Sequence, residues 1–234
     1  MRFPSTVGAE VFVFSDFLGA AIDPAFAGVA ENSGTAALKV AEEGGVVELV
    51  TGTGDGNRAH LSTGLNHVPS NGSIIGRYRV KSVTSAATRA IFVGFTDTVG
   101  QEMPIEISGT TVTTTATNAV GFVYDTDATT DIWYFLAVNA DMDKGALVPV
   151  PNFFTGQVPT ADVWQNFAIE ITPDGDAIAS FGTGDKRKLI EVARIEDAVA
   201  TTSKLSPIVV VEARTAAAKT VHVDYMGVLS GRAD

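Results

Sequence analysis

The stretch Trp164-Gln165-Asn166-Phe167-Ala168-Ile169-Glu170-Ile171 leads into the turn Pro173-Asp174-Gly175-Asp176 and then into the apolar run Ala177–Phe181. Three large apolar residues of the first stretch, Phe167, Ile169 and Ile171, occupy alternate positions, as in a strand with one buried face. The glycine of the turn supplies a position at which positive φ is tolerated. This segment therefore predicts a β-hairpin that places one face in a hydrophobic core.

Runs of the same kind recur along the chain, and clusters of Gly, Asn, Asp and Pro separate them. We expect strands at Val11–Phe14, Ala37–Val40, Val46–Thr51, Ala59–Thr63, Ser73–Val83, Arg89–Thr96, Pro104–Ile107, Ala119–Asp125, Ile132–Asn139, Trp164–Thr172, Ala177–Gly182, Lys188–Ile195, Pro207–Ala213 and Thr220–Leu229. One short helix is predicted around Arg194–Ala200. The pattern favours an all-β fold, a two-sheet antiparallel sandwich that forms a single domain over residues 1–234.

Strand alternation also predicts which side chains share a face. In the final strand, Val221, Val223 and Tyr225 are expected on one side. His222 falls on the other, polar side, and we predict that it lies at the surface or in an interface and is not a catalytic base.

The composition excludes several classes of function. The 234 residues include no cysteine and only three histidines, which removes disulfides, thiolate metal sites and cysteine nucleophiles. Lys and Arg number 16 against 27 Asp and Glu, so the net charge is −11 at pH 7. A chain this acidic repels phosphate groups. We therefore expect it to bind neither nucleic acid nor an anionic membrane surface.

The N-terminal stretch Phe3–Glu10 is interrupted by polar groups before the apolar core of a signal peptide could form. The chain also lacks a run of about 18 apolar residues, which a membrane-spanning helix requires. We expect a soluble protein that is either intracellular or part of an assembly built inside a cell.

Several short motifs carry a resemblance to a known fold family. They are Phe14–Gly19, Val93–Asp97, Ala119–Asp127, Trp164–Ile171 with its following hairpin, and Thr220–Val228. These stretches resemble laminin-G-like or concanavalin-A-like jelly-roll domains, particularly those of tailed-phage virion proteins.

The resemblance implies a structural protein of a bacteriophage virion, most concretely a capsid decoration (cement) protein that binds the major capsid protein. By analogy with other cement proteins it implies a homo-oligomer, a trimer, made in the host cytoplasm and placed on the capsid surface. The alternative is a carbohydrate-binding or receptor-binding module of a phage tail. A lectin is expected to expose aromatic side chains on loops. Most aromatic residues here fall within strands, which favours the decoration protein.

The sequence predicts no enzymatic activity. Jelly-roll glycoside hydrolases carry their carboxylate pair on a strand with the pattern Glu-x-Asp-x-x-Glu, and this chain has no such run. Its nearest acidic strand residues, Glu106, Glu170 and Glu212, lie far apart in sequence. No Gly-x-Ser-x-Gly motif is present, and the three histidines occur in unrelated contexts. We expect no catalytic residues and no cofactor.

One cluster of aspartates is a candidate calcium site. Asp125, Asp127 and Asp131 are closely spaced carboxylates, which are the hard oxygen ligands that calcium prefers. An EF-hand loop would need glycine where Thr130 stands and glutamate where Leu136 stands. The other interpretation is a polar hairpin tip in which the aspartates form Asx turns.

The aromatic residues Trp133, Tyr134, Phe135 and Trp164 either stack on a sugar or fill the core. Alternation places Trp133 and Phe135 on one face and Tyr134 on the other, and we expect most of these side chains in the core.

An apolar segment broken by Pro149 and Pro151 is the predicted capsid contact. Its candidate anchor residues are Leu147, Val148, Val150, Phe153 and Phe154. Either these side chains are exposed on a loop and dock on a capsid, or the segment folds over the sheet and fills the core.

Overall fold

The computed structural model describes residues 10–39, 44–83, 87–100, 102–149, 158–184 and 188–231. The helix in this part of the chain is a single 3₁₀ turn, η1 (Pro69–Asn71), and no described helix is long and apolar enough to cross a membrane. The strands are β1 (Glu10–Ser15), β2 (Ala27–Ala30), β3 (Thr35–Leu38), β4 (Val47–Val50), β5 (Arg58–Ser62), β6 (Ile74–Ser82), β7 (Arg89–Thr96), β8 (Ile105–Ser108), β9 (Thr111–Thr114), β10 (Asn118–Asp125), β11 (Trp133–Asn139), β12 (Met142–Pro149), β13 (Trp164–Ile171), β14 (Ala177–Thr183), β15 (Ile190–Ile195), β16 (Ser206–Ala213) and β17 (Thr220–Gly231).

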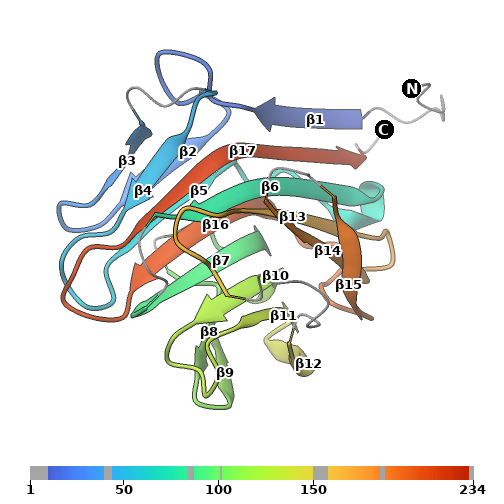
Figure 1. Cartoon of the computed structure of the whole chain (residues 1–234). Coiled ribbons are helices and arrows are strands. Elements are labelled where there is room, and N and C mark those ends of the chain that lie inside the picture. The colour runs from blue at the N-terminus through green and yellow to red at the C-terminus, as the bar shows by residue number, and fades with distance from the viewer. Residues whose placement is uncertain are drawn as a thin grey trace.

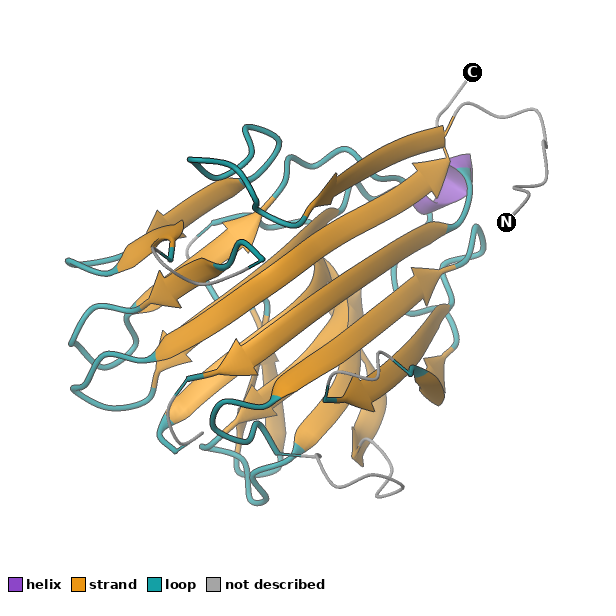
Figure 2. Ribbon diagram, turned by 45° about the horizontal axis from the view of Figure 1, so that its top comes forward, coloured by secondary structure: helices purple, strands orange, loops and turns teal. Residues whose placement is uncertain are grey.

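Two large sheets lie face to face, as Figure 1 shows, and Figure 2 turns the outer face of one of them toward the viewer. The eight-stranded sheet has the order β15-β14-β13-β6-β17-β4-β3, and β1 also pairs with β17. The seven-stranded sheet has the order β12-β11-β10-β7-β16-β5-β2. Neighbouring strands in both sheets are antiparallel, so the predicted two-sheet antiparallel sandwich is confirmed.

Aromatic side chains from both sheets meet in the core between them. The ring of Phe167 on β13 lies 5.0 Å from the ring of Phe122 on β10 and 5.0 Å from that of Trp133 on β11. Phe135 belongs to the same buried cluster, so the predicted core positions of Trp133 and Phe135 are confirmed. Large buried rings contribute much of the apolar area that holds two sheets together.

The hairpin of β8 and β9 covers part of the outer face of the seven-stranded sheet. Ile105 and Ile107 of β8 join a second buried cluster with Phe92 of β7 and Val123 of β10. Tyr134, which the alternation of β11 directs away from the main core, also belongs to this second cluster. This region of the sheet therefore has apolar packing on both of its faces.

Strand β17 departs from simple alternation. Val221 and Val223 are buried in the main core as expected, but the register with β6 shifts between Val223 and Tyr225. The resulting β-bulge brings Met226 into the core and leaves Tyr225 partly exposed on the outer face. The prediction that Tyr225 shares a face with the two valines is wrong, because one extra residue reverses the alternation beyond it.

Two further local predictions differ from the structure. The segment Arg194–Ala200, expected to be helical, completes β15 at Ile195 and then forms a turn. The sequence pattern also fails to predict β2, whose residues are small, and β12, whose apolar and polar residues do not alternate. Both strands are terminal strands of the seven-stranded sheet. Pairing with a neighbouring strand, rather than local preference, explains their extended form.

Replacing Phe167 by alanine is expected to lower the free energy of unfolding by about 3–5 kcal/mol, because the side chain is fully buried and its loss leaves a cavity. Chemical denaturation measures this change. Phe12→Ala is the matched control, since Phe12 is 68% exposed and its removal should change stability by less than about 1 kcal/mol. Equal effects of the two substitutions would contradict the assigned core.

Candidate functional site

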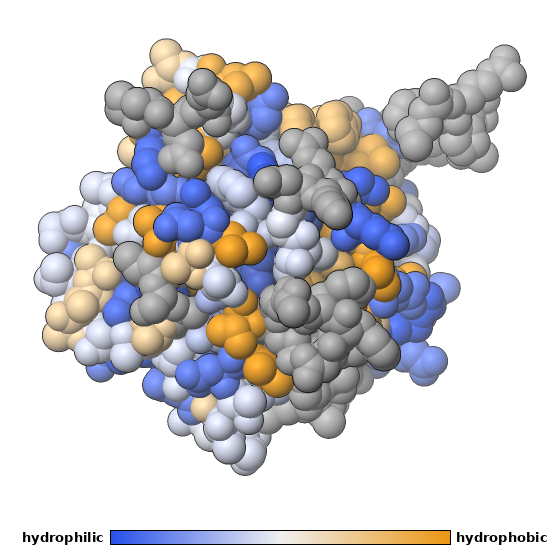
Figure 3. All heavy atoms as spheres, in the orientation of Figure 1, coloured by the Kyte–Doolittle hydropathy of each residue, from blue (hydrophilic) through white to orange (hydrophobic). Residues whose placement is uncertain are grey.

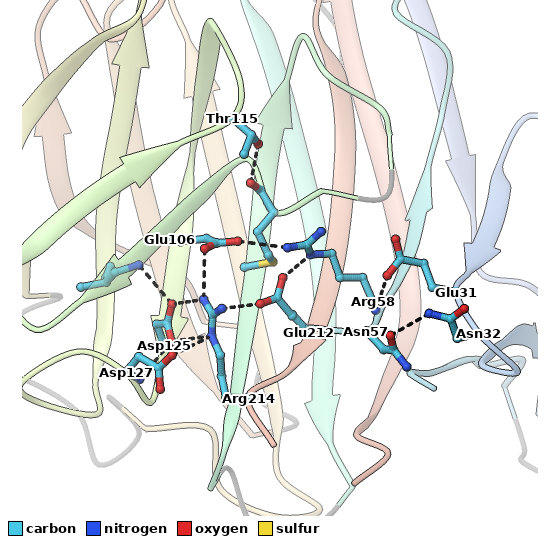
Figure 4. Close-up of polar contacts among 12 residues, drawn as sticks. Glu31, Asn32, Asn57, Arg58, Glu106, Thr115, Asp125, Asp127, Glu212 and Arg214 are labelled. Carbon is cyan, nitrogen blue, oxygen red and sulfur yellow. Dashed lines mark hydrogen bonds and ion pairs between the residues drawn. The ribbon is translucent and has the colours of Figure 1, made fainter. Parts of the chain in front are cut away.

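A network of charged side chains lies on the outer face of the seven-stranded sheet (Figure 4). At its centre is Arg214, which directly follows β16. Its Nη2 lies 2.5 Å from Oδ2 of Asp125, the last residue of β10, and its Nε lies 3.0 Å from Oδ1 of the same carboxylate. The Nε of Arg214 is also 3.5 Å from Oδ2 of Asp127. Two of the three predicted calcium ligands thus lie around one guanidinium group.

The other half of the network connects three strands. Arg58, the first residue of β5, donates from Nε to Glu212 on β16, and its Nη2 lies 3.4 Å from Oε1 of Glu106 on β8. Arg214 pairs with the other oxygen of each carboxylate, through Nη1 to Glu212 and through Nη2 to Glu106 at 3.7 Å. Glu106 comes from the covering hairpin, so the ion pairs attach that hairpin to the sheet at one end.

The buried carboxylates in this network are compensated by the two arginines. Asp125 is 0% exposed and also accepts a hydrogen bond from the backbone N–H of Ile107 at 3.1 Å. Burial on its own would lower the pKa of Arg214, but the hydrogen bond from Asp125 and the charges of Asp125, Glu212 and Glu106 raise it above the ordinary value. The guanidinium of Arg214 is therefore positively charged at neutral pH and well above it.

The predicted calcium ligands have different surroundings. Asp131 is exposed and lies in the turn that precedes β11, whereas Asp125 is occupied by Arg214. In the described part of the chain, no group of three or more His, Cys, Asp or Glu side chains is arranged to hold a metal ion. Calcium at Asp125, Asp127 and Asp131 stays a prediction. The cation that the structure places among these carboxylates is Arg214.

The acidic residues considered for glycoside hydrolysis have different surroundings. Glu106 and Glu212 are brought together, although 105 positions separate them in the chain, by their shared contacts with Arg58 and Arg214. Glu170 lies on β13 in the opposite sheet. The first two carboxylates are held as hydrogen-bond acceptors, and Glu212 is only 1% exposed.

The outer face of the eight-stranded sheet carries a second candidate site. In the register of the strands, Phe14 of β1 lies opposite Gly227 of β17, and Gly227 lies opposite Arg77 of β6. Ala168 of β13 is the next residue in this row. Glycine contributes no side chain, so the row has a gap between the ring of Phe14 and the guanidinium of Arg77.

This gap is part of a hollow of about 400 Å³, which we call the β1 groove. Its walls include Phe12, Phe14 and Tyr225, and its floor includes Gly227. The ring centroids of Phe12 and Phe14 are 6.1 Å apart, and those of Phe14 and Tyr225 are 6.0 Å apart. A Cβ atom added to Gly227 would stand only 2.7 Å from Cδ2 of Phe14, so the glycine allows the aromatic ring to lie close to the sheet.

A second, more polar hollow adjoins the β1 groove and shares Phe14 and Tyr225 with it. There, Nη1 of Arg79 lies 2.5 Å from Oδ2 of Asp224, the residue at the β-bulge. The guanidinium of Arg79 also lies 4.7 Å from the ring centroid of Trp164. Trp164 is thus on the outer face, outside the core, and packs against a cation.

All three histidines are buried: His60 on β5, His67 in the loop after β5, and His222 on β17. The prediction of a surface position for His222 is wrong, because residues from the neighbouring strands cover it. Its Nε2 lies 2.9 Å from Oε2 of Glu48 and 3.4 Å from Nζ of Lys39. Burial lowers the pKa of His222 below its usual value.

The predicted capsid-contact segment is described only in part. Leu147 and Val148 lie in β12, the terminal strand of the seven-stranded sheet, which pairs with β11. Val150, Phe153 and Phe154 lie outside the described residues. Docking of a capsid on these five residues stays a prediction.

Sequence reasoning did not identify the two arginines of the network or the aromatic groove. One signal was available: the charged pair Glu212 and Arg214 interrupts the end of an otherwise apolar strand, and buried charges in such a position need partners. Phe12 and Phe14 give a second signal, since they alternate with valines in β1 and must therefore lie on the opposite face from them.

The sequence matches no protein-family model and no curated protein. Solved structures nevertheless share the fold over most of their length. A protein of unknown function from Shewanella oneidensis MR-1 has a TM-score of 0.62 at 13% identity, covering 96% of this chain and 90% of that one. Peanut lectin, solved with a 9mer peptide, has a TM-score of 0.60 at 11% identity, covering 97% of this chain and 100% of the lectin.

A third similar structure is the exoplasmic/lumenal domain of VIP36 in its Ca²⁺- and Man3GlcNAc-bound form. Its TM-score is 0.56 at 9% identity, and the match covers 90% of this chain and 85% of that domain. Likeness at these identities shows the fold alone. The chain has the legume-lectin-like, concanavalin-A-like β-sandwich fold.

Replacing Arg214 by methionine is expected to lower the free energy of unfolding by about 3–5 kcal/mol, because it leaves Asp125 and Glu212 as buried charges with less compensation. The variant should then gain a calcium-dependent rise in melting temperature, since an added cation replaces the lost one. Differential scanning fluorimetry with calcium and with a chelator measures both effects.

Arg194→Met is the control for this experiment, because Arg194 has a 52% exposed side chain and one distant ion pair with Glu191 at 3.8 Å. If the wild-type protein itself loses stability in chelator, an ion already binds among these aspartates, and our assignment of Arg214 as their cation is wrong.

Proposed function

We propose that this chain is a non-enzymatic carbohydrate-binding domain and that a glycan binds in the β1 groove. The observation that carries the proposal is the pairing of exposed aromatic rings with fixed polar groups in adjoining hollows of about 400 Å³ each. Sugar rings present C–H groups on their faces and hydroxyl groups around their edges. A ligand site for them therefore needs both aromatic surface and oriented hydrogen-bonding groups.

The residues of the two hollows meet both requirements. Phe12 and Phe14 are 68% and 45% exposed, which gives the aromatic surface. The Arg79–Asp224 pair provides oriented donors and acceptors beside it. Tyr225, whose hydroxyl donates to Oδ1 of Asn166 at 3.5 Å, lies between the aromatic and the polar part.

Figure 3 shows apolar atoms at the surface along the upper edge of the molecule, where Figure 1 places β1. Exposed apolar surface of this kind is a common property of interaction sites. The names of two similar structures, a lectin and a domain solved with Man3GlcNAc, support a glycan as the ligand. The ion pairing of Glu106 and Glu212 supports a role without acid–base catalysis.

Binding to a broad glycan array, followed by calorimetry on the best ligand, tests the proposal. We expect Phe14→Ala to weaken binding at least about tenfold, because stacking surface is lost. Gly227→Ala should weaken it as well, since the new methyl group displaces the ring of Phe14. Met142→Ala, an exposed apolar substitution outside both hollows, is the control. Absence of glycan binding, or affinity unchanged by both groove variants, would contradict the proposal.

The finer proposal concerns location, and it rests on the resemblance to tailed-phage virion proteins. A receptor-binding module of a phage tail would use the groove to hold a glycan of the host surface. The other candidate is a capsid decoration protein that binds the major capsid protein as a homo-oligomer. The observation that favours docking on a protein shell is the strip of Phe12, Phe14 and Leu18, whose exposed side chains could serve as apolar anchors.

The two locations give different results on particles. For a decoration protein, virions lacking it should release DNA at lower temperature, and added protein should restore them unless Phe12 and Leu18 are replaced by serine. For a tail module, labelled protein should be found at the tail, and the purified protein should block adsorption to host cells. Thermal release assays and electron microscopy of labelled virions separate these outcomes.

A further inference from the structure

Arg77 lines the β1 groove with an exposed side chain, and its guanidinium has no ion pair or side-chain hydrogen bond among the described residues. Its cross-strand neighbours are Gly227 on β17 and Ala168 on β13, which are too small to cover it. The next outward residue on β6, Arg79, is paired with Asp224. Arg58 and Arg214, in the network on the opposite sheet, are also paired with carboxylates.

An unpaired arginine in this position is notable because acidic residues outnumber basic ones by 27 to 16 in the chain. The nearest acidic side chains in the strand register belong to Glu170, opposite Ile75, and to Asp224, which is held by Arg79. Neither forms an ion pair with Arg77 in the structure. The guanidinium therefore remains available to a ligand, with aromatic rings on one side of the same hollow.

We propose that the glycan bound in the β1 groove is acidic, and that Arg77 binds the carboxylate of a uronic acid residue. The inference rests on the proposed function and adds the class of ligand. A guanidinium presents two parallel N–H donors that match a carboxylate, and the apolar walls of the groove strengthen this pairing relative to open water. Phe14 holds the sugar ring while Arg77 selects for its charge.

Because the net charge of the chain is −11, only a short-range contact can attract an acidic glycan. At long range the chain repels a polyanion, so attraction depends on direct contact with Arg77 and not on a broad basic surface. Added salt weakens both the long-range repulsion between the chain and the glycan and the attraction between Arg77 and the carboxylate. The affinity for acidic oligosaccharides should therefore fall by less than about threefold between 50 and 200 mM salt, in contrast to a binder that neutralises many charges.

Matched oligosaccharides provide the direct test: uronate oligomers, the same oligomers with their carboxyl groups reduced to alcohols, and sulfated neutral oligomers of equal length. The wild-type protein should bind the uronate form about ten- to a hundredfold more tightly than the reduced form. Arg77→Gln should remove this preference, because the affinity for the uronate form falls to that for the reduced form. Arg77→Lys should restore part of the preference, because lysine keeps the charge and loses the two-pronged contact.

Arg194→Gln, which removes an exposed arginine outside the groove, should have no effect. The inference is overturned if Arg77→Gln keeps the preference, or if sulfated oligomers bind more tightly than uronates. Neutral glycans that bind equally well and depend on Phe14 would overturn the acidic ligand while leaving the proposed function in place. If no oligosaccharide binds the wild-type protein, both proposals fail together.

Discussion

The contact of Phe167 with Phe122 and Trp133 joins the two sheets, and the remaining features depend on it. Each ring is fixed by a strand that is paired on both sides, so the core sets the distance and orientation of the sheets. With the inner faces committed to this core, ligand-facing residues must lie on the outer faces. One outer face carries the β8–β9 hairpin, whereas the other leaves aromatic side chains of β1 exposed.

Most of the fold could be predicted from sequence because burial on one face of a strand leaves a period of two. The hairpin of β13 and β14 shows this clearly, since Phe167, Ile169 and Ile171 are buried as alternation requires. The β-bulge in β17 could not be predicted in this way. It depends on how Val223 and Tyr225 pair with β6, and that information belongs to two strands more than 130 residues apart.

Residues of the candidate sites could be predicted only where they lie close together in the sequence. Asp125 and Asp127 were identified from their spacing, but their partner Arg214 lies 89 residues away from Asp125 in the chain. The groove depends even more on tertiary structure. Three strands contribute its residues Phe14, Gly227 and Arg77. None of these residues, taken alone in the sequence, indicates a binding site. A glycine in a strand pattern indicates only that something approaches closely.

The place of β17 in the eight-stranded sheet has a consequence for synthesis on the ribosome. Strand β17 follows the other strands of this sheet in sequence, lies between β6 and β4, and is also the partner of β1. Three strands made earlier, β1, β4 and β6, therefore each have an unpaired edge until β17 emerges. At about 5–20 residues per second, the nascent polypeptide exposes unpaired strand edges for on the order of ten seconds or more. Such edges can pair with other chains, so production of this sandwich should respond strongly to the supply of chaperones.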